Sequence, residues 1–125
     1  MKLLASIRNT TSIGQSAEKQ AARHLQEHGL KIVRQNFRCK GGEIDIIARD
    51  NETLVFVEVR HRKSNRFGTP GETVTYKKQQ RIILAAQFFL QTLKTQPQCR
   101  FDVIESRPGE ASEINFNWIK DAFGC

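Results

Sequence analysis

The apolar residues of the chain follow two different spacings. Between Ser16 and His28, alanine and leucine recur three or four positions apart and Gly29 follows, which predicts an amphipathic helix. A second stripe of this kind predicts a longer helix over about 74–94. In the other stretches β-branched and aromatic residues dominate. They predict strands over 30–37, 43–49, 53–62 and 100–105.

Short polar segments join these elements. Asp50-Asn51-Glu52 is typical of a tight turn, so the strands on either side are predicted to form an antiparallel hairpin. Residues 63–73 are predicted to be a polar loop, and 114–119 fits either a short last strand or a helix. The order α-β-β-β-α-β predicts an α/β fold with one mixed sheet flanked by helices. A flexible arm over 1–13 is expected before a single domain over 14–125.

Composition and charge narrow the class of protein. A chain of 125 residues with 38% hydrophobic and 26% charged residues is typical of one globular domain. The net charge of +7 and the pI near 9.7 favour nucleic acid as a partner, ahead of an acidic membrane surface. No apolar run approaches the about 20 residues that a membrane helix needs, and the first eight residues have too short an apolar core for a signal peptide. A cytoplasmic location is therefore expected.

The charges are unevenly distributed along the chain. Residues 1–42 and 59–81 each carry a net charge of +6, whereas 43–58 carry −4 and 82–125 carry −1. An acidic segment between two basic ones suits a metal-dependent phosphodiesterase, in which carboxylates bind a hard cation and basic side chains hold the nucleic-acid backbone. Charge alone leaves open the alternative of a chance alternation of charges along surface strands.

The register of the predicted hairpin points to particular residues. With a two-residue turn at 51–52, Asp45 falls opposite Glu58 and Glu43 falls opposite Arg60. Two opposed carboxylates repel each other unless a cation lies between them or one is protonated. These four residues are expected to cluster on one face, or else to form a solvated face with a Glu43–Arg60 ion pair. The other face is expected to enter the core and consists of Ile44, Ile46, Val57 and Val59.

Two residues of the predicted helices could join this cluster. Glu18 lies at the edge of the apolar face of the first helix, where packing on the sheet would direct it towards the hairpin. The alternative is an ordinary glutamate near a helix N-terminus, where the helix dipole favours an acid. Lys77 lies in the first turns of the second helix, a position at which lysine is usually a solvated surface charge.

Several of these segments match the motifs of a known family. The matching segments are Gly14-x-x-Ala17-Glu18-x-x-Ala21, Arg34-Gln35-Asn36-Phe37-Arg38, Gly42-Glu43-Ile44-Asp45-Ile46-Ile47-Ala48-x-Asp50, Val55-Phe56-Val57-Glu58-Val59-Arg60-x-Arg62, Lys77-x-x-x-Arg81 and Arg100-Phe101-Asp102-Val103-Ile104. Over residues 14–105 the chain resembles the YraN family of small bacterial proteins. That family is grouped with the restriction-endonuclease-like, or PD-(D/E)XK, superfamily and looks most like archaeal Holliday junction resolvases.

The resemblance implies the fold described above and a set of site residues. In that superfamily a helix glutamate, a strand aspartate and an acid-x-lysine triplet bind one or two magnesium ions for phosphodiester hydrolysis. The matching positions here are Glu18, Asp45 and Glu58, as ligands of Mg²⁺ or Mn²⁺. This sequence has Arg60 where the motif has lysine, and an arginine cannot act as a general base, although it can stabilise charge on a phosphate. Lys77 is the candidate to supply the missing amine.

Together with the charge pattern, the resemblance implies a magnesium-dependent endonuclease acting on branched or structured DNA. Its phosphate-binding residues are expected to be Arg34, Arg38, Arg62, Lys63, Arg66, Lys78 and Arg81. A homodimer is expected by analogy, because a junction has two symmetric cuts. Two alternatives stay open. The first is a nucleic-acid-binding protein that does not cleave, which Arg60 favours. The second is an adaptor that meets a protein partner through Phe67, Tyr76 and Trp118.

Overall fold

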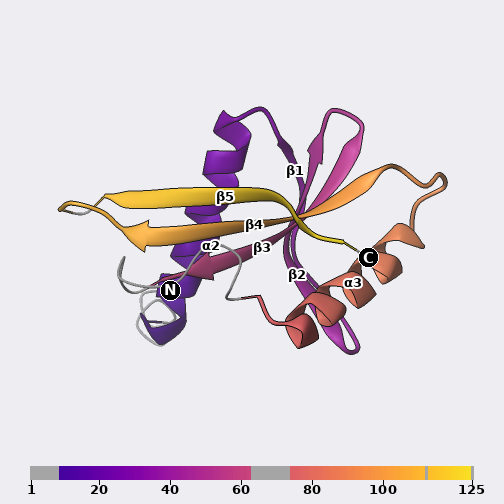
Figure 1. Ribbon diagram of the computed structural model, residues 1–125, viewed down its shortest axis with the longest axis horizontal. Coiled ribbons are helices and arrows are strands. Elements are labelled where there is room, and N and C mark those ends of the chain that lie inside the picture. Colours follow the sequence, from indigo (N-terminus) through magenta and orange to yellow (C-terminus); the bar gives the residue numbers. More distant parts are fainter. Residues whose placement is uncertain (1–8, 63–73, 112, 125) are drawn as a thin grey trace, which may run out of the picture.

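The computed structural model describes residues 9–62, 74–111 and 113–124, with side chains from Ser16 onward. A helix is followed by three strands, a second helix and two further strands (Figure 1). The predicted α/β class and element order are confirmed, and the last segment is a strand. The elements are α2 (Asn9–Glu27), β1 (Lys31–Cys39), β2 (Gly42–Asp50), β3 (Thr53–His61), α3 (Tyr76–Leu90), β4 (Cys99–Pro108) and β5 (Ile114–Phe123).

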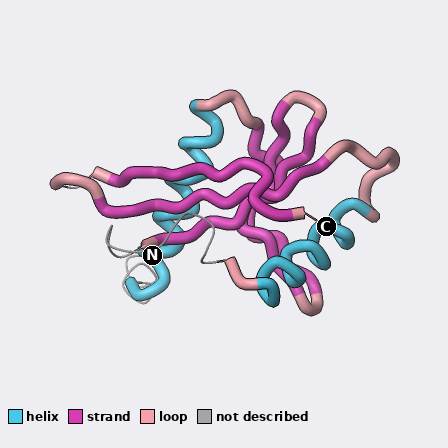
Figure 2. The backbone as a smooth tube through the Cα atoms, in the orientation of Figure 1, coloured by secondary structure: helices cyan, strands magenta, loops and turns pink. Residues whose placement is uncertain are grey.

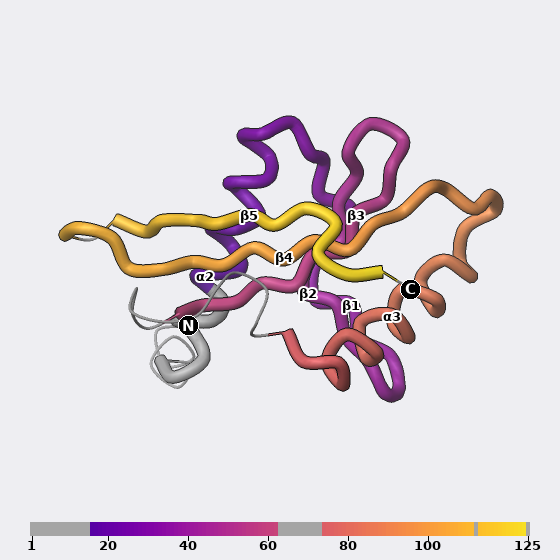
Figure 3. The backbone as a smooth tube through the Cα atoms, in the orientation of Figure 1, coloured from indigo at the N-terminus to yellow at the C-terminus, as the bar shows by residue number. Residues whose placement is uncertain are grey.

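All five strands belong to one mixed sheet in the order β1-β2-β3-β4-β5. The pairs β1–β2, β2–β3 and β4–β5 are antiparallel, as expected for strands joined by short turns. The pair β3–β4 is parallel, because the chain crosses over through α3 before it returns to the sheet. Figure 3 allows this crossover to be followed, with β5 running back along β4.

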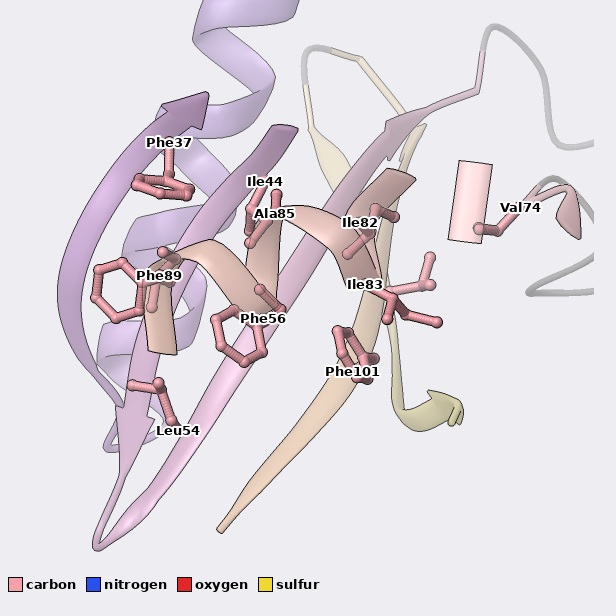
Figure 4. Packing of buried hydrophobic residues seen from close by; sticks show 13 residues of the cluster. Phe37, Ile44, Leu54, Phe56, Val74, Ile82, Ile83, Ala85, Phe89 and Phe101 are labelled. Carbon is pink, nitrogen blue, oxygen red and sulfur yellow. The ribbon is translucent and has the colours of Figure 1, made fainter. Parts of the chain in front are cut away.

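The two helices lie on opposite sides of the sheet, and each covers its own core (Figure 2). α2 packs through Ala21 and Leu25 on small and β-branched residues of the central strands. On the other face α3 covers a cluster rich in aromatic residues, in which Phe56, Phe89 and Phe101 pack together (Figure 4). Burial on both faces explains why β3 is apolar without alternation from Leu54 to Val57. β4 is likewise buried without interruption from Phe101 to Ser106, although Asp102, Glu105 and Ser106 are polar.

The element boundaries differ from the predicted ones mainly at the helices. α2 begins at Asn9, so residues 9–13 of the predicted arm are helical, and the rest of that arm lies outside the described residues. The predicted loop over 63–73 also lies outside them. α3 begins after Thr75, whose hydroxyl oxygen accepts a hydrogen bond from the Lys78 backbone N–H at 3.1 Å. In the described part of the chain, no helix is both long and apolar enough to cross a membrane.

Candidate active site where β2 and β3 separate

The β2–β3 hairpin has the predicted register near its turn. Asn51 and Glu52 form the two-residue turn, and the ladder runs from there to the pair Ile46↔Val57. Asn51 has a φ of 54°, the left-handed conformation that this kind of turn requires and that asparagine tolerates. The position of Asp45 and Glu58 directly beyond the last pair therefore follows from the sequence.

Beyond this point β2 separates from β3, and the Asp45 side chain closes the gap. In a continued ladder the Val59 N–H would donate to the Ile44 carbonyl oxygen. Instead it donates to Asp45 Oδ2 at 2.8 Å. The Asp45 carboxylate thus takes the place of a backbone acceptor and is held between the two strands.

The neighbouring strand β1 is irregular at the same place. The β1–β2 ladder places Asn36 opposite Asp45, and Asn36 has a φ of 54°. Ile44 packs in the cluster under α3, beside Ala85 in Figure 4, whereas Ile46 packs in the cluster under α2. Of the four residues predicted to share one core face, Ile44 is therefore wrongly assigned. The alternation of β2 reverses at Asp45, opposite the left-handed residue.

Glu58 is buried beside Asp45, and only 4% of its surface is exposed. Arg60 Nη1 and Lys78 Nζ each lie 3.8 Å from Glu58 Oε2. Burial, followed by the charge of Asp45 and a hydrogen bond between the two carboxyl groups, raises the pKa of Glu58 to about 8 against the opposing effect of the two cations. Arg60 and Lys78 therefore lower the pKa of Glu58 without offsetting the effects of burial and of Asp45.

Glu18 brings a third carboxyl group to this place from α2. Burial raises its pKa, as do the charges of Asp45 and Glu43, while the charge of Arg38 lowers it. Its Oε1 atom is buried and has no hydrogen-bond partner among the described residues. Glu18 therefore lies within the electrostatic reach of the hairpin acids, as its place on the helix suggests, and its role as a metal ligand stays a prediction.

Glu43 is linked to the Asp45–Glu58 pair through a lysine of α3. Lys78 Nζ lies 3.4 Å from Glu43 Oε1, and Arg38 Nε lies 3.8 Å from Glu43 Oε2. The alternative Glu43–Arg60 ion pair is therefore not formed. Glu43 pairs with Lys78 and Arg38, and Arg60 contacts Glu58. The polar residues of the hairpin do gather around one site, with Lys78 between Glu43 and Glu58.

The lysine that reaches these acids is Lys78, whereas its neighbour Lys77 is exposed. Neighbouring helix residues lie about 100° apart around the axis, so only one of the two can face the strands. Sequence reasoning placed Lys78 among the phosphate-binding residues and did not anticipate its contacts with Glu43 and Glu58. The signal that could have indicated them is Gly42, because a glycine within a strand often marks a close backbone approach.

Gly42 allows α3 to lie directly against β2. A Cβ atom at this position would collide with the backbone oxygen of Arg81 and lie 3.2 Å from Ala85. We expect Gly42→Ala to lower the free energy of unfolding by about 1–3 kcal/mol, as measured by urea denaturation, because the helix backbone has to shift. Gly124→Ala is the control, since its Cβ would meet nothing within 4 Å. Equal losses in the two variants would contradict this role of Gly42.

The predicted phosphate-binding residues do not all face solvent. Arg34, Arg38 and Arg81 are exposed. Arg62 is instead directed inward, with its Nε 3.3 Å from Oε2 of the fully buried Glu105. The other two predicted residues, Lys63 and Arg66, lie outside the described residues. The basic surface near the site therefore includes side chains of β1 and α3.

The carboxyl groups of the site fit a hard divalent cation in type and charge. Mg²⁺ prefers oxygen ligands, keeps several waters, and usually takes one or two protein carboxylates together with substrate phosphate. Asp45 and Glu58 offer two adjacent carboxyl groups, and the charge of Asp45 contributes, after burial, to the raised pKa of Glu58. The Oε1 atom of Glu18, which has no hydrogen-bond partner among the described residues, is a further candidate ligand. Among the side chains that the structure describes, no three His, Cys, Asp or Glu residues form a metal site by themselves. Asp45 and Glu58 are therefore the candidate pair.

Comparison with known proteins adds a family to this geometry. Residues 17–105 match the uncharacterised protein family UPF0102, a range that contains every acid of the candidate site. The chain belongs to the UPF0102 family. The predicted YraN-like membership is thus confirmed.

Similar UPF0102 proteins have nearly the same length as this chain. One from Hahella chejuensis is 55% identical over 114 residues, which is 90% of each chain. Another, from Herminiimonas arsenicoxydans, is 50% identical over 110 residues, covering 88% of this chain and 85% of the relative. A third, from Cupriavidus pinatubonensis, is 46% identical over 123 residues, covering 97% and 93%. These UPF0102 relatives are therefore similar to this chain over nearly all of its length.

Proposed function

We propose that this UPF0102 protein is a metal-dependent nuclease that hydrolyses phosphodiester bonds in branched or structured DNA. The observation that carries the proposal is the meeting of the half-buried Asp45 with the buried Glu58, beside the cations Arg60 and Lys78. The resemblance to junction resolvases and the net charge of +7 support DNA as the substrate.

Asp45 and Glu58 are the residues that would hold Mg²⁺ or Mn²⁺, with Glu18 as a further ligand directly or through water. A divalent cation bound there supplies Lewis acidity to a phosphoryl oxygen and lowers the pKa of a bound water. The Val59 N–H orients Asp45 without cancelling its charge, as hydrogen bonds to metal-binding carboxylates commonly do. The protein thus offers two adjacent carboxyl groups held between two strands.

The neighbouring cations suit the negative charge of a phosphodiester. Arg60 and Lys78 lie near Glu58 but beyond hydrogen-bond distance of it, so each can donate to a phosphate oxygen there. Arg60 stays protonated and cannot accept a proton from water, which limits it to stabilising charge. The exposed Arg38 and Arg81 extend the positive surface along the DNA backbone.

A cleavage assay on a panel of DNA structures tests this proposal. Purified protein is incubated with Mg²⁺ or Mn²⁺ and with four-way junctions, forks, flaps, linear duplex and single strands. We expect strand cleavage that EDTA abolishes and that is fastest on the branched substrates. Tight binding of these DNAs without cleavage of any of them, in either metal, would overturn the nuclease proposal.

A nucleic-acid-binding protein that does not cleave is the second candidate. Arg60 favours it, because it replaces the lysine of the superfamily motif with a residue that cannot act as a base. The signature of this alternative is an affinity that falls steeply with salt concentration and no turnover.

The adaptor alternative has less support from the described residues. Tyr76 is 75% exposed, as a binding anchor would be. Trp118 is half-buried, and its Nε1–H donates to the buried Asp102 at 2.9 Å, so it serves the fold. The remaining anchor, Phe67, lies outside the described residues.

A further inference from the structure

Lys78 lies between two carboxylates, and Glu43 makes the closer contact. The Lys78 ammonium donates to Glu43 Oε1 at 3.4 Å, whereas Glu58 Oε2 lies 3.8 Å away, beyond hydrogen-bond distance. The Lys78 side chain is 27% exposed, whereas that of Glu58 is 5% exposed. Glu43 is therefore the closer partner of this ammonium.

The backbone holds both members of this pair in place. Glu43 directly follows Gly42, where β2 touches α3, and lies two residues before Asp45 on the same strand. The backbone N–H of Lys78 is fixed by the helix-capping Thr75. The strand that carries Asp45 thus also carries the partner of the Lys78 ammonium.

We propose that Glu43 is a positioning residue that holds the Lys78 ammonium for contact with the phosphate of a substrate bound at Asp45 and Glu58. This inference rests on the proposed function. An ammonium group has three N–H donors, and its bond to Glu43 uses one. Lys78 can therefore bond to a phosphate oxygen while Glu43 still holds it, and it supplies a primary amine near Glu58 where position 60 is an arginine.

A double-mutant cycle tests whether Glu43 acts through Lys78. Single-turnover cleavage of a four-way DNA junction is measured for Glu43→Gln, Lys78→Ala and the double variant at saturating Mg²⁺. We expect rates lower by about 10-fold for Glu43→Gln and about 100-fold for Lys78→Ala, and a double variant no slower than Lys78→Ala. Losses that multiply in the double variant would overturn the proposal.

Arg38→Ala is the matched control, because Arg38 is the other cation that contacts Glu43. Its side chain is 75% exposed and belongs to the proposed DNA-binding surface, so we expect weaker DNA binding in this variant. In the double variant of Arg38→Ala and Glu43→Gln the two substitutions should act independently. The fall in cleavage rate caused by Glu43→Gln should then be the same as in the unmodified background. If the Glu43→Gln loss instead disappears in the Arg38→Ala background, Glu43 acts through Arg38 and the proposal is wrong.

A second readout does not depend on cleavage. In nitrogen-15 NMR spectra of the metal-free protein, the Lys78 ammonium resonance is assigned by its absence in Lys78→Arg. We expect Glu43→Gln to shift or broaden it, and Glu52→Gln, at the exposed turn, to leave it unchanged. An unchanged resonance in Glu43→Gln would overturn the inference even in an active nuclease. A resonance that responds in a protein that cleaves no DNA would support the Glu43–Lys78 pairing and count against the nuclease proposal.

Discussion

Asparagine at position 45 should abolish cleavage while the fold and DNA binding are kept. We expect Asp45→Asn to lower the single-turnover rate on a four-way junction by roughly 1,000-fold or more, because a neutral amide no longer attracts a divalent cation. The amide oxygen can still accept the Val59 N–H, so the closure between β2 and β3 is preserved. Cleavage rates, fluorescence anisotropy with labelled DNA and Mn²⁺ binding by electron paramagnetic resonance measure the three properties.

Glu58→Gln should likewise abolish cleavage while DNA binding is kept, since it removes the second carboxylate of the Asp45–Glu58 pair. Glu52→Gln is the control, because Glu52 is an exposed acid at the turn of the same hairpin. It should cleave at the rate of the unmodified protein. Normal cleavage by both Asp45→Asn and Glu58→Gln would rule out this pair as the catalytic centre. A loss of DNA binding in proportion to cleavage would indicate a binding defect instead.

The hairpin illustrates which part of the site is predictable. Two turn residues and the alternation of the strands leave one favourable pairing, so the register and the approach of Asp45 to Glu58 follow from local patterns. The separation of β2 from β3 does not follow from local sequence patterns. It involves Asn36 in a third strand and a carboxylate in place of a backbone acceptor, and neither has a local sequence signature.

The helices also show which features of the site can be predicted from the sequence and which depend on tertiary packing. The place of Glu18 at the edge of the Ala17–Ala21 stripe indicates an orientation towards the hairpin, although the same place also suits an ordinary helix glutamate. Choosing between Lys77 and Lys78 requires the rotation of α3 about its axis, which is set by the close approach at Gly42. Tertiary packing of this kind cannot be derived from periodicity alone.

The site should also make the metal-free protein less stable as pH rises. The pKa of Glu58 is raised to about 8 in the folded protein, chiefly by burial, and its ordinary value of 4.5 applies to the unfolded chain. Below pH 4.5 the Glu58 carboxyl group is neutral in both the folded and the unfolded protein, so it does not change the free energy of unfolding. Between 4.5 and 8 the unfolded chain releases the proton first, so the free energy of unfolding falls. We expect a loss on the order of 3 kcal/mol between pH 5 and pH 8, measured by urea denaturation in EDTA.

Comparison with Glu58→Gln, whose amide side chain cannot titrate, isolates the contribution of Glu58 to this loss of stability. His24 has a lowered pKa, mainly because of burial, and so favours folding at higher pH, but it is present in both proteins and cancels in the difference. Relative to the unmodified protein, Glu58→Gln should gain stability from pH 5 to pH 8. Excess Mg²⁺ should remove most of that gain, because the cation stabilises the ionised carboxylate only where Glu58 is present. A constant difference across this range would mean that the pKa of Glu58 keeps its ordinary value, and that burial beside Asp45 does not favour a bound cation here.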